Sequence, residues 1–312
     1  MLKVLIAEPT HENLQKKLEQ KGFICYYKPE LSFTELQNLI PEYEGLVIRS
    51  KFKIDRDFLD LATNLKFIAR AGAGMENIDT EYAIKNNVLC INSPEGNRDS
   101  VGEHALGMLL ALFHKINIAN NEVKNGIWDR QLNIGVEIQG KTVGILGYGN
   151  MGGAFAKRLK GFDANVIAYD KYKSNFSDEY AKEVNEKEYF DETEILSIHL
   201  PLTEETLFLV NKKYLRKFSK LKYIINTARG KIIKTDDLVN QLKSGNILGA
   251  CLDVLEYEKH SFKDIFKGKN SPTLEYLINS NNVILTPHVA GSSDASYRKI
   301  ADVMAEKIIN SF

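Results

Sequence analysis

The amino-acid sequence predicts an α/β fold with two doubly wound parallel sheets, and three observations lead to this prediction. The length of 312 residues is typical of about two domains. Short apolar runs alternate with helical patterns along the chain, as in parallel sheets that helices cover on both faces. A glycine-rich turn also lies between one such run and a helical pattern near the middle of the chain.

The predicted strands are short, nearly continuous apolar runs of the kind found in buried parallel sheets. Each run is followed by a turn or a helical pattern, so the chain repeats a strand–helix unit. In chain order, the runs are residues 3–7, 45–49, 67–70, 88–92, 143–146, 166–169, 195–199, 223–226, 249–253 and 283–286.

The glycine-rich turn has the G-x-G-x-x-G spacing at Gly147, Gly149 and Gly152, between the strand at 143–146 and a helix predicted at 151–159. The first glycine permits a tight turn, and the second lets the backbone approach a pyrophosphate. The third allows close packing of the helix on the strand. The unit is therefore predicted to bind a dinucleotide at the N-terminus of the helix.

The strand that follows this helix ends at Asp170, near the interval expected for the acid that binds the adenosine ribose hydroxyls. A carboxylate there would repel the 2′-phosphate of NADP, so we predict NAD as the cofactor. Lys171 and Lys173 follow directly and could soften that repulsion. Moderate tolerance of NADP is therefore left open.

The domain boundaries are predicted from one long helical pattern and two loop signals. Residues 100–123 contain no breaking proline, so they are expected to form a single helix between domains. The preceding SPEGN segment has the residues of a hinge loop, and residues 286–291 offer a second crossing. We predict a discontinuous, flavodoxin-like substrate-binding domain (1–98 plus 291–312), an NAD-binding Rossmann-like domain (99–290) and an active-site cleft between them.

Composition excludes several classes of partner. The chain has 41 basic and 41 acidic residues, so nothing favours nucleic acid or an anionic membrane surface. The first apolar run ends at Glu8 and is too short for a signal peptide or a membrane span. Cys25, Cys90 and Cys251 are odd in number and lack metal-type spacing. We therefore expect no metal site and a reducing, cytoplasmic location.

Three polar residues follow predicted strands of the second domain, where open α/β sheets place their sites: Arg229, Glu258 and His288. Hydride transfer to a 2-oxo acid needs a cation for the carboxylate, and a guanidinium such as Arg229 can bind one bidentately. It also needs an acid–base group, which a histidine such as His288 provides near neutral pH. Glu258 could stabilise the protonated imidazole.

Each of these residues also has an ordinary structural explanation. An arginine after a strand is usually solvated or ion-paired, and Glu258 could be a surface acid beside Glu256. His288 could be a turn histidine, and Asp253 could cap the next segment. The catalytic interpretation rests on their occurrence together with the dinucleotide unit.

Nearly the whole chain resembles the D-isomer-specific 2-hydroxyacid dehydrogenase family, and most closely its short phosphoglycerate dehydrogenases. The chain departs from the family where Lys259 replaces the usual proline after the glutamate. No regulatory domain is expected after Phe312, and therefore no serine feedback through one. The matching motifs are RAGAGMENID (70–79), NSPEGNRDSVGEHALGMLLAL (92–112), GIWDR (126–130), the glycine fingerprint, SIHLPLTEET (197–206), NTARGKII (226–233), LDVLEYE (252–258) and TPHVAGSS (286–293).

The resemblance implies a catalytic set of Arg229, Glu258 and His288. It also implies contacts with the pyrophosphate, the adenosine and the nicotinamide of NAD, and with a substrate held by the outer domain. The implied cofactor-binding residues are Gly147, Gly149, Asn150, Met151, Gly152, Asp170, His199, Pro201, Thr227, Ala228, Asp253, His288 and Ala290. The implied substrate-binding residues are Arg49, Ser50, Gly72, Ala73, Gly74, Arg130 and Arg229.

The expected substrate is D-3-phosphoglycerate, oxidised to 3-phosphohydroxypyruvate in serine biosynthesis. Arg49, Lys51 and Arg130 could bind its phosphate, although a solvated basic loop is the alternative. Glyoxylate/hydroxypyruvate reductase and a corepressor-like NAD-sensing protein are left open. In relatives the tryptophan of the GIWDR motif packs into a neighbouring subunit, so the resemblance also predicts a homodimer with Trp128 as an anchor.

Overall fold

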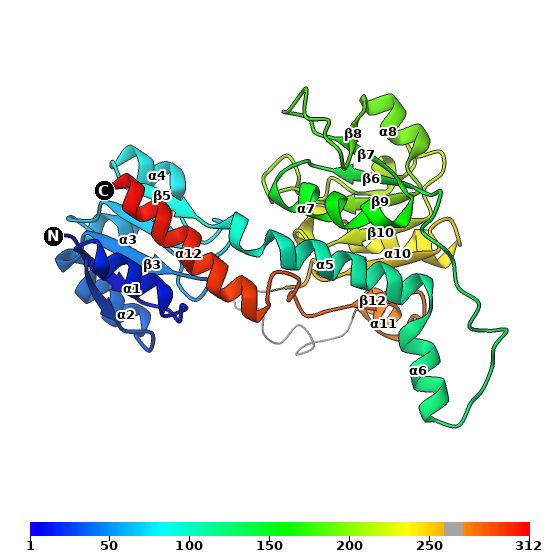
Figure 1. The fold of residues 1–312 in the computed structure, drawn as a ribbon, viewed down its shortest axis with the longest axis horizontal. Coiled ribbons are helices and arrows are strands. Elements are labelled where there is room, and N and C mark those ends of the chain that lie inside the picture. Colours follow the sequence, from blue (N-terminus) through cyan, green and yellow to red (C-terminus); the bar gives the residue numbers. More distant parts are fainter. Residues whose placement is uncertain (259–270) are drawn as a thin grey trace. The chain divides into compact units, whose positions relative to one another are not determined.

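The computed structural model describes residues 1–258 and 271–312, which divide into two compact units (Figure 1). Unit 1 comprises Met1–Arg98 and Ser292–Phe312, and unit 2 comprises Asp99–Gly291. Gly291 thus belongs to unit 2, whereas the sequence analysis assigned it to the first domain. Lys259, where the chain departs from the family it resembles, lies outside the described residues.

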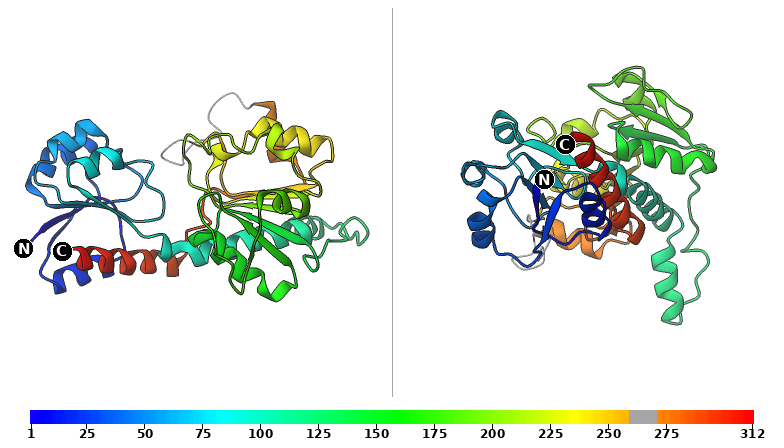
Figure 2. Two further views of the ribbon diagram at one scale, coloured as in Figure 1. Left: turned by 90° about the horizontal axis from the view of Figure 1, so that it is seen from above. Right: turned by 60° about the vertical axis from the view of Figure 1, so that its left-hand side comes forward.

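Unit 1 contains a parallel sheet with the strand order β2-β1-β3-β4-β5. Successive residues of β1 point to opposite faces: Val4 packs under α1 and α12, whereas Leu5 packs under α2 and α3. Figure 2 shows helices on both faces of this sheet. The strands are β1 Lys3–Ile6, β2 Ile24–Tyr27, β3 Gly45–Ile48, β4 Phe67–Arg70 and β5 Leu89–Asn92, and the helices are α1 Asn13–Gln20, α2 Phe33–Leu39, η1 Ile40–Glu42, α3 Arg56–Leu61, α4 Thr80–Lys85 and α12 Asp294–Ser311.

Unit 2 contains a second parallel sheet, with the order β12-β11-β10-β9-β6-β7-β8. The chain enters at β6, builds outward through β7 and β8, and then returns to β9 on the other side, which makes β6 and β9 the switch point. The strands are β6 Thr142–Leu146, β7 Asn165–Tyr169, β8 Lys182–Glu183, β9 Ile195–Ile198, β10 Tyr223–Asn226, β11 Gly249–Leu252 and β12 Val283–Leu285. The helices are α5 Pro94–Phe113, which begins in unit 1, α6 Ile116–Lys124, α7 Asn150–Leu159, η2 Lys160–Phe162, α8 Glu186–Glu192, α9 Lys212–Leu215, η3 Gly230–Ile232, α10 Thr235–Lys243 and α11 Pro272–Asn279.

The predicted α/β class with two parallel sheets is confirmed, and each predicted strand is present. Two strands were missed. Strand β2, with the sequence ICYY, has a short apolar and aromatic run that was overlooked; it is an edge strand with mostly exposed side chains. Strand β8 has two residues, too few for any periodicity. No helix in the described part of the chain is long and apolar enough to cross a membrane.

Two predictions about the region between the units were wrong. The segment SPEGN is not a loop, because α5 already begins at Pro94, a residue well suited to the first position of a helix. The single helix predicted over 100–123 is two helices, α5 and α6. Between them Lys115 adopts a left-handed backbone conformation with φ of 50°, which an α-helix does not accommodate.

The turn between β6 and α7 depends on close packing at Gly152, the third glycine of the fingerprint. A Cβ at this position would lie 2.3 Å from the carbonyl oxygen of Gly147. Gly153, the next residue of the same helix, has room, since its nearest neighbour would be a Tyr148 ring carbon at 3.9 Å.

We therefore predict that Gly152→Ala lowers the free energy of unfolding by about 1–3 kcal/mol, because the helix must move away from the strand. Gly153→Ala is the matched control and should be neutral or stabilising by up to about 1 kcal/mol, because alanine favours helix. Urea denaturation followed by circular dichroism measures both. Equal effects of the two substitutions would contradict the packing argument.

Candidate active site and cofactor-binding site

Glu258 and His288 form a hydrogen-bonded pair in unit 2. Oε2 of Glu258 lies 2.7 Å from Nδ1 of His288, and the two side chains are only 18% and 24% exposed. The other carboxylate oxygen, Oε1, accepts the backbone N–H of Leu255. Glu258 is thus held by its own loop and in turn fixes the imidazole, so that Nε2 is directed away from the carboxylate.

The backbone at His288 adopts an uncommon conformation. Its φ is 55°, in the left-handed region that non-glycine residues occupy only when their surroundings impose it. Its N–H donates to the carbonyl oxygens of Asp253 at 2.8 Å and of Thr286 at 3.1 Å. Residues with such backbone strain occur often at functional sites.

Asp253 holds the loop that carries His288. Its side chain is buried, and Oδ1 accepts hydrogen bonds from the Thr286 hydroxyl at 2.6 Å and the Val289 N–H at 2.9 Å. Oδ2 accepts the Ala290 N–H at 2.9 Å. The family resemblance implies that Asp253 contacts the cofactor, a role that stays a prediction. In the structure its carboxylate organises the loop after β12.

His104 of α5 extends this network. Its Nε2 lies 3.0 Å from the Thr286 hydroxyl and 3.7 Å from Oδ1 of Asp253. Sequence reasoning missed both His104 and Thr286, although each lies within a motif that was recognised, EHALG and TPHVAG. The two residues are 182 positions apart in the sequence, so no local pattern reveals their contact.

The loop after β10 carries Arg229 and is shaped by Asn226. The Asn226 amide donates to the carbonyl oxygen of Arg229 at 3.0 Å and accepts the N–H of Ala228, also at 3.0 Å. Nη1 of Arg229 donates to the carbonyl oxygen of Ala228 at 2.7 Å. These contacts give the start of the loop a defined conformation at the end of the strand.

Three neighbouring strands bring the predicted catalytic residues to one edge of the sheet. Strands β10, β11 and β12 are paired in parallel, with Asn226 opposite Leu252 and Leu252 opposite Leu285. Gly230 allows the first two loops to touch, since a Cβ there would lie 2.0 Å from the backbone of Leu255. The segments with Arg229, Glu258 and His288 therefore all leave the same edge.

The glycine turn after β6 suits a pyrophosphate. Gly147 has φ of 89°, and Gly149 precedes α7, a helix of 10 residues whose first residues are Asn150 and Met151. A Cβ at Gly149 would meet nothing within 4 Å, so there is open space over the turn. The N–H groups and positive dipole end of a helix N-terminus favour an anion at this place.

Two buried polar atoms at the same edge of the sheet as this turn support a bound cofactor. Oγ1 of Thr227 and Nδ1 of His199 are buried and have no hydrogen-bond partner among the described residues. Burial lowers the pKa of His199 to about 3, so its ring is neutral, and Nε2 is hydrogen-bonded to the Ser197 hydroxyl at 2.8 Å. Orphaned polar atoms of this kind call for a partner, which a dinucleotide would supply.

Asp170, at the end of β7, has a fixed orientation. Oδ2 accepts the N–H of Tyr148 at 3.0 Å, and Oδ1 accepts those of Tyr172 at 3.0 Å and Lys173 at 3.2 Å. Two carboxylate oxygens offer about four acceptor positions, so a position is left for a ribose hydroxyl. Of the remaining predicted cofactor residues, Ala228 and Ala290 are buried in strand-end loops and Pro201 is exposed.

The predicted substrate residues Arg49 and Ser50 lie in unit 1 on a loop organised by Glu8. Glu8 is 4% exposed and accepts the N–H groups of Arg49 at 2.8 Å, Ser50 at 3.2 Å and Lys51 at 3.1 Å. The Lys51 ammonium donates a hydrogen bond to the carbonyl oxygen of Leu31. The Arg49 guanidinium lies 5.5 Å from the ring centre of Tyr297.

The second predicted substrate loop, Gly72 to Gly74, follows β4 in the same unit. Gly72 exchanges hydrogen bonds with Ser93, and Asn92 donates to the carbonyl oxygen of Ala73 at 2.7 Å. Arg130 lies in unit 2 and is exposed, in the segment after α6. Thus the structure groups Arg49, Ser50 and the Gly72 to Gly74 loop in unit 1, and the catalytic candidates in unit 2.

Comparison with known proteins agrees with this geometry. The family model "D-isomer specific 2-hydroxyacid dehydrogenase, NAD binding domain" matches residues 106–290. The chain is 35% identical to D-3-phosphoglycerate dehydrogenase of Archaeoglobus fulgidus, over 99% of this chain but 57% of that protein. It is 34% identical to hydroxypyruvate reductase of Thermotoga maritima, over 98% of this chain and 97% of that one. A solved D-lactate dehydrogenase of Aquifex aeolicus, complexed with NAD and lactic acid, superposes with a TM-score of 0.81 at 26% identity, over 98% of this chain and 94% of that one.

The hydrogen bond from Thr286 to the buried Asp253 yields a stability prediction. Thr286→Val removes the hydroxyl but keeps the shape, leaving a buried carboxylate oxygen with one donor fewer. We expect the free energy of unfolding to fall by about 1–3 kcal/mol.

Thr273→Val is the matched control. It removes a hydroxyl that donates to Asp236 at the surface, where water replaces the lost bond, so the change should stay within about 0.5 kcal/mol. Urea denaturation measures both variants. A loss for Thr286→Val no larger than for Thr273→Val would show that Asp253 does not depend on that hydroxyl.

Proposed function

The chain belongs to the D-isomer specific 2-hydroxyacid dehydrogenase family, and from this premise we propose that it is an NAD-dependent D-3-phosphoglycerate dehydrogenase. It would oxidise 3-phosphoglycerate to 3-phosphohydroxypyruvate, a step of serine biosynthesis. The observation that carries the proposal is the 2.7 Å pair of Glu258 and His288, at the same edge of the sheet as the dinucleotide turn. It supplies the acid–base group that a 2-hydroxyacid dehydrogenase needs.

The residues divide the chemistry as follows. When bound, the reduced nicotinamide supplies the hydride that C2 of the 2-oxo acid accepts. Arg229 binds the substrate carboxylate and polarises the adjacent carbonyl. His288 donates the proton from Nε2 to the carbonyl oxygen while Glu258 holds Nδ1, so hydride and proton together give the 2-hydroxy acid. In the oxidising direction His288 removes the hydroxyl proton.

We propose that Arg49 binds the phosphate group of the substrate. Among the described residues, its guanidinium makes a ring contact with Tyr297 but no hydrogen bond or ion pair with another side chain. Lys51, the other cation of this loop, already binds the Leu31 carbonyl oxygen. An arginine bound only to an aromatic face keeps its five N–H donors for phosphoryl oxygens.

The second candidate function is hydroxypyruvate or glyoxylate reduction. It is favoured by the engagement of Lys51 with Leu31, which leaves fewer cations for a phosphate, and by the T. maritima reductase, which aligns over almost its entire length. A corepressor-like NAD sensor is less well supported, because a binding protein has no need of the Glu258 and His288 pair.

Substrate preference tests the proposal. Loss of NADH absorbance is followed with 3-phosphohydroxypyruvate, hydroxypyruvate, glyoxylate and 2-oxoglutarate. We expect the highest kcat/KM for the phosphorylated acid. Arg49→Ala should lower that value by about 10–100-fold, as expected for a lost charge-assisted hydrogen bond, and hardly affect glyoxylate.

Two controls accompany this assay. His288→Ala should lose about 10²–10⁴ in kcat on every substrate and still bind NADH, as expected for a lost acid–base group. Arg56→Ala removes an exposed arginine of the same unit, paired with Asp79, and should leave the preference unchanged. Equal or higher kcat/KM for the unphosphorylated acids would identify the reductase instead, and tight NADH binding without turnover would identify the sensor.

We further propose that the chain forms a homodimer through α6 and the segment that follows it. Apolar side chains are unusually exposed there: Trp128 is 80% exposed, Leu132 65% and Ile134 63%. Figure 1 shows that α6 and the segment after it extend beyond the sheet and the other helices of unit 2. An apolar patch of this kind is typical of a protein interface, and a second copy of the chain is the proposed occupant.

Trp128→Ala should raise the dimer dissociation constant by at least about 30-fold, the effect of losing an aromatic anchor worth roughly 2 kcal/mol. Ile84→Ala is the control, because Ile84 is 65% exposed on α4 of the other unit. Analytical ultracentrifugation over a dilution series measures both. A chain that stays monomeric at high concentration, or a Trp128→Ala dimer as tight as the wild type, would count against this interface.

The cellular compartment is proposed from the cysteines. Cys25, Cys90 and Cys251 are all unpaired thiols. Burial raises the pKa of each thiol above its usual value, so the thiols are less reactive than exposed ones. Free, unreactive thiols fit the reducing cytoplasm.

A further inference from the structure

The loops on both sides of the glycine turn are joined by a charged contact. Strand β6 lies between β9 and β7 in the sheet, so the loops after β9 and β7 flank the turn that β6 feeds. One loop carries Glu205, and the other carries Lys171 and Tyr172 directly after Asp170. Glu205 accepts a hydrogen bond from the Lys171 ammonium with one oxygen and from the Tyr172 hydroxyl with the other.

Both sides of this contact are held in place. On the Glu205 side, the buried Thr206 donates to the carbonyl oxygen of Pro201 at 2.6 Å and accepts the N–H of Thr203 at 2.8 Å. On the Lys171 side, Asp170 accepts the N–H of Tyr172. The hydrogen bond from Lys171 lowers the pKa of Glu205, which is therefore ionised at neutral pH.

The other lysine of this loop is also engaged. The Lys173 ammonium donates to the carbonyl oxygen of Tyr148 at 2.9 Å. Tyr148 further holds the loop through its hydroxyl, which donates to Asp178, and through its ring, which stacks on Phe176 at 5.2 Å. Both cations that could compensate Asp170 are thus bound to other groups.

We propose that Glu205 is a specificity-determining residue of the cofactor site, which excludes a 2′-phosphorylated adenosine by holding Lys171 and Tyr172 away from it. A 2′-phosphate would then meet the Asp170 carboxylate without a compensating cation. Glu205 also contributes a negative charge of its own to the same region. The inference rests on the NAD-binding domain and not on which 2-hydroxy acid the enzyme uses.

The expected size of the effect follows from Coulomb's law. In water-like surroundings, removing one negative charge at about 6 Å from a dianion strengthens the binding of that dianion roughly tenfold. The released lysine adds a favourable contact of similar size. Because Lys171 and Glu205 are exposed side chains, salt screens the effect, which should be larger at low ionic strength.

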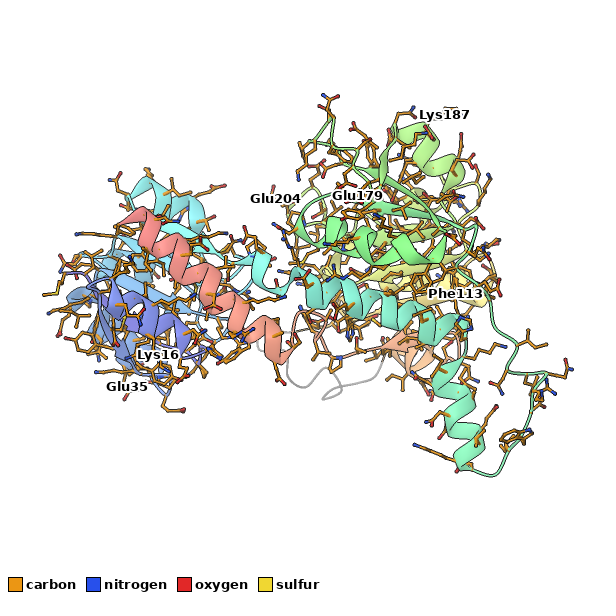
Figure 3. The ribbon with its side chains drawn as sticks, viewed as in Figure 1. Lys16, Glu35, Phe113, Glu179, Lys187 and Glu204 are labelled. Atoms are coloured by element: carbon orange, nitrogen blue, oxygen red, sulfur yellow. The ribbon has the colours of Figure 1, made fainter. Side chains whose placement is uncertain are left out.

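The test uses ligand binding and needs no turnover. Isothermal titration calorimetry compares adenosine 2′,5′-bisphosphate with 5′-AMP on the purified chain. For Glu205→Ala we expect the dissociation constant of the bisphosphate to fall about tenfold or more, with that of 5′-AMP within twofold. Glu204→Ala is the matched control: it removes the same charge from the neighbouring exposed residue, which Figure 3 labels.

Lys171→Ala, alone and combined with Glu205→Ala, separates released lysine from lost negative charge. In the wild type it should weaken bisphosphate binding by up to about tenfold, because the charge of Glu205 is then uncompensated, whereas in Glu205→Ala it should abolish most of the gain and return the affinity to near the wild-type value. The ratio of kcat/KM with NADPH to kcat/KM with NADH should rank the variants in the same order as their affinity for the bisphosphate. Thermal unfolding confirms that each variant folds.

Three results would overturn the proposal. The first is unchanged bisphosphate affinity in a folded Glu205→Ala protein. The second is an equal gain in Glu204→Ala, which would reduce the effect to net charge. The third is a gain that survives Lys171→Ala. Failure of the proposed substrate would leave all of these titrations unaffected, so the two proposals can fail separately.

Discussion

The hydrogen bonds of the buried Asp253 carboxylate are the interactions on which the geometry of the candidate active site depends. Asp253 is only 1% exposed, and burying a carboxylate costs free energy unless hydrogen bonds replace those it made with water. Here one hydroxyl and two backbone N–H groups do so, all from the loop after β12. Satisfying Asp253 therefore requires that loop to take one conformation, in which His288 has a positive φ and reaches Glu258.

Acidic side chains that accept backbone N–H groups also occur at other strand ends of the molecule. Glu8 gathers the N–H groups of the loop after β3, and Asp170 those of Tyr148 and of its own loop. Glu258 binds the N–H of Leu255. In a parallel sheet all strand ends of one kind lie at one edge, so each of these acids can stiffen a loop that carries functional residues.

The cofactor side shows how charge is arranged for selectivity rather than stability. Surface ion pairs such as that of Lys171 and Glu205 contribute little to folding. Their position beside Asp170 gives them a different consequence, because they decide which charges an incoming ligand meets. The neutral, buried His199 and the acids around the turn leave the helix N-terminus as the positive element for a pyrophosphate.

The sequence by itself determined the class of fold, the positions of the buried strands along the chain and the dinucleotide turn. These depend on local periodicity and on glycines at fixed spacing. It also singled out Arg229, Glu258 and His288, whose roles stay predictions, by their motifs. Only the tertiary structure decided the rest: the break at Lys115, the hydrogen bond from Thr286 to Asp253, the contact of His104 with Thr286, and the contact of Glu205 with Lys171. These features depend on a single backbone conformation or on partners distant in sequence, for which the chain carries no periodic signal.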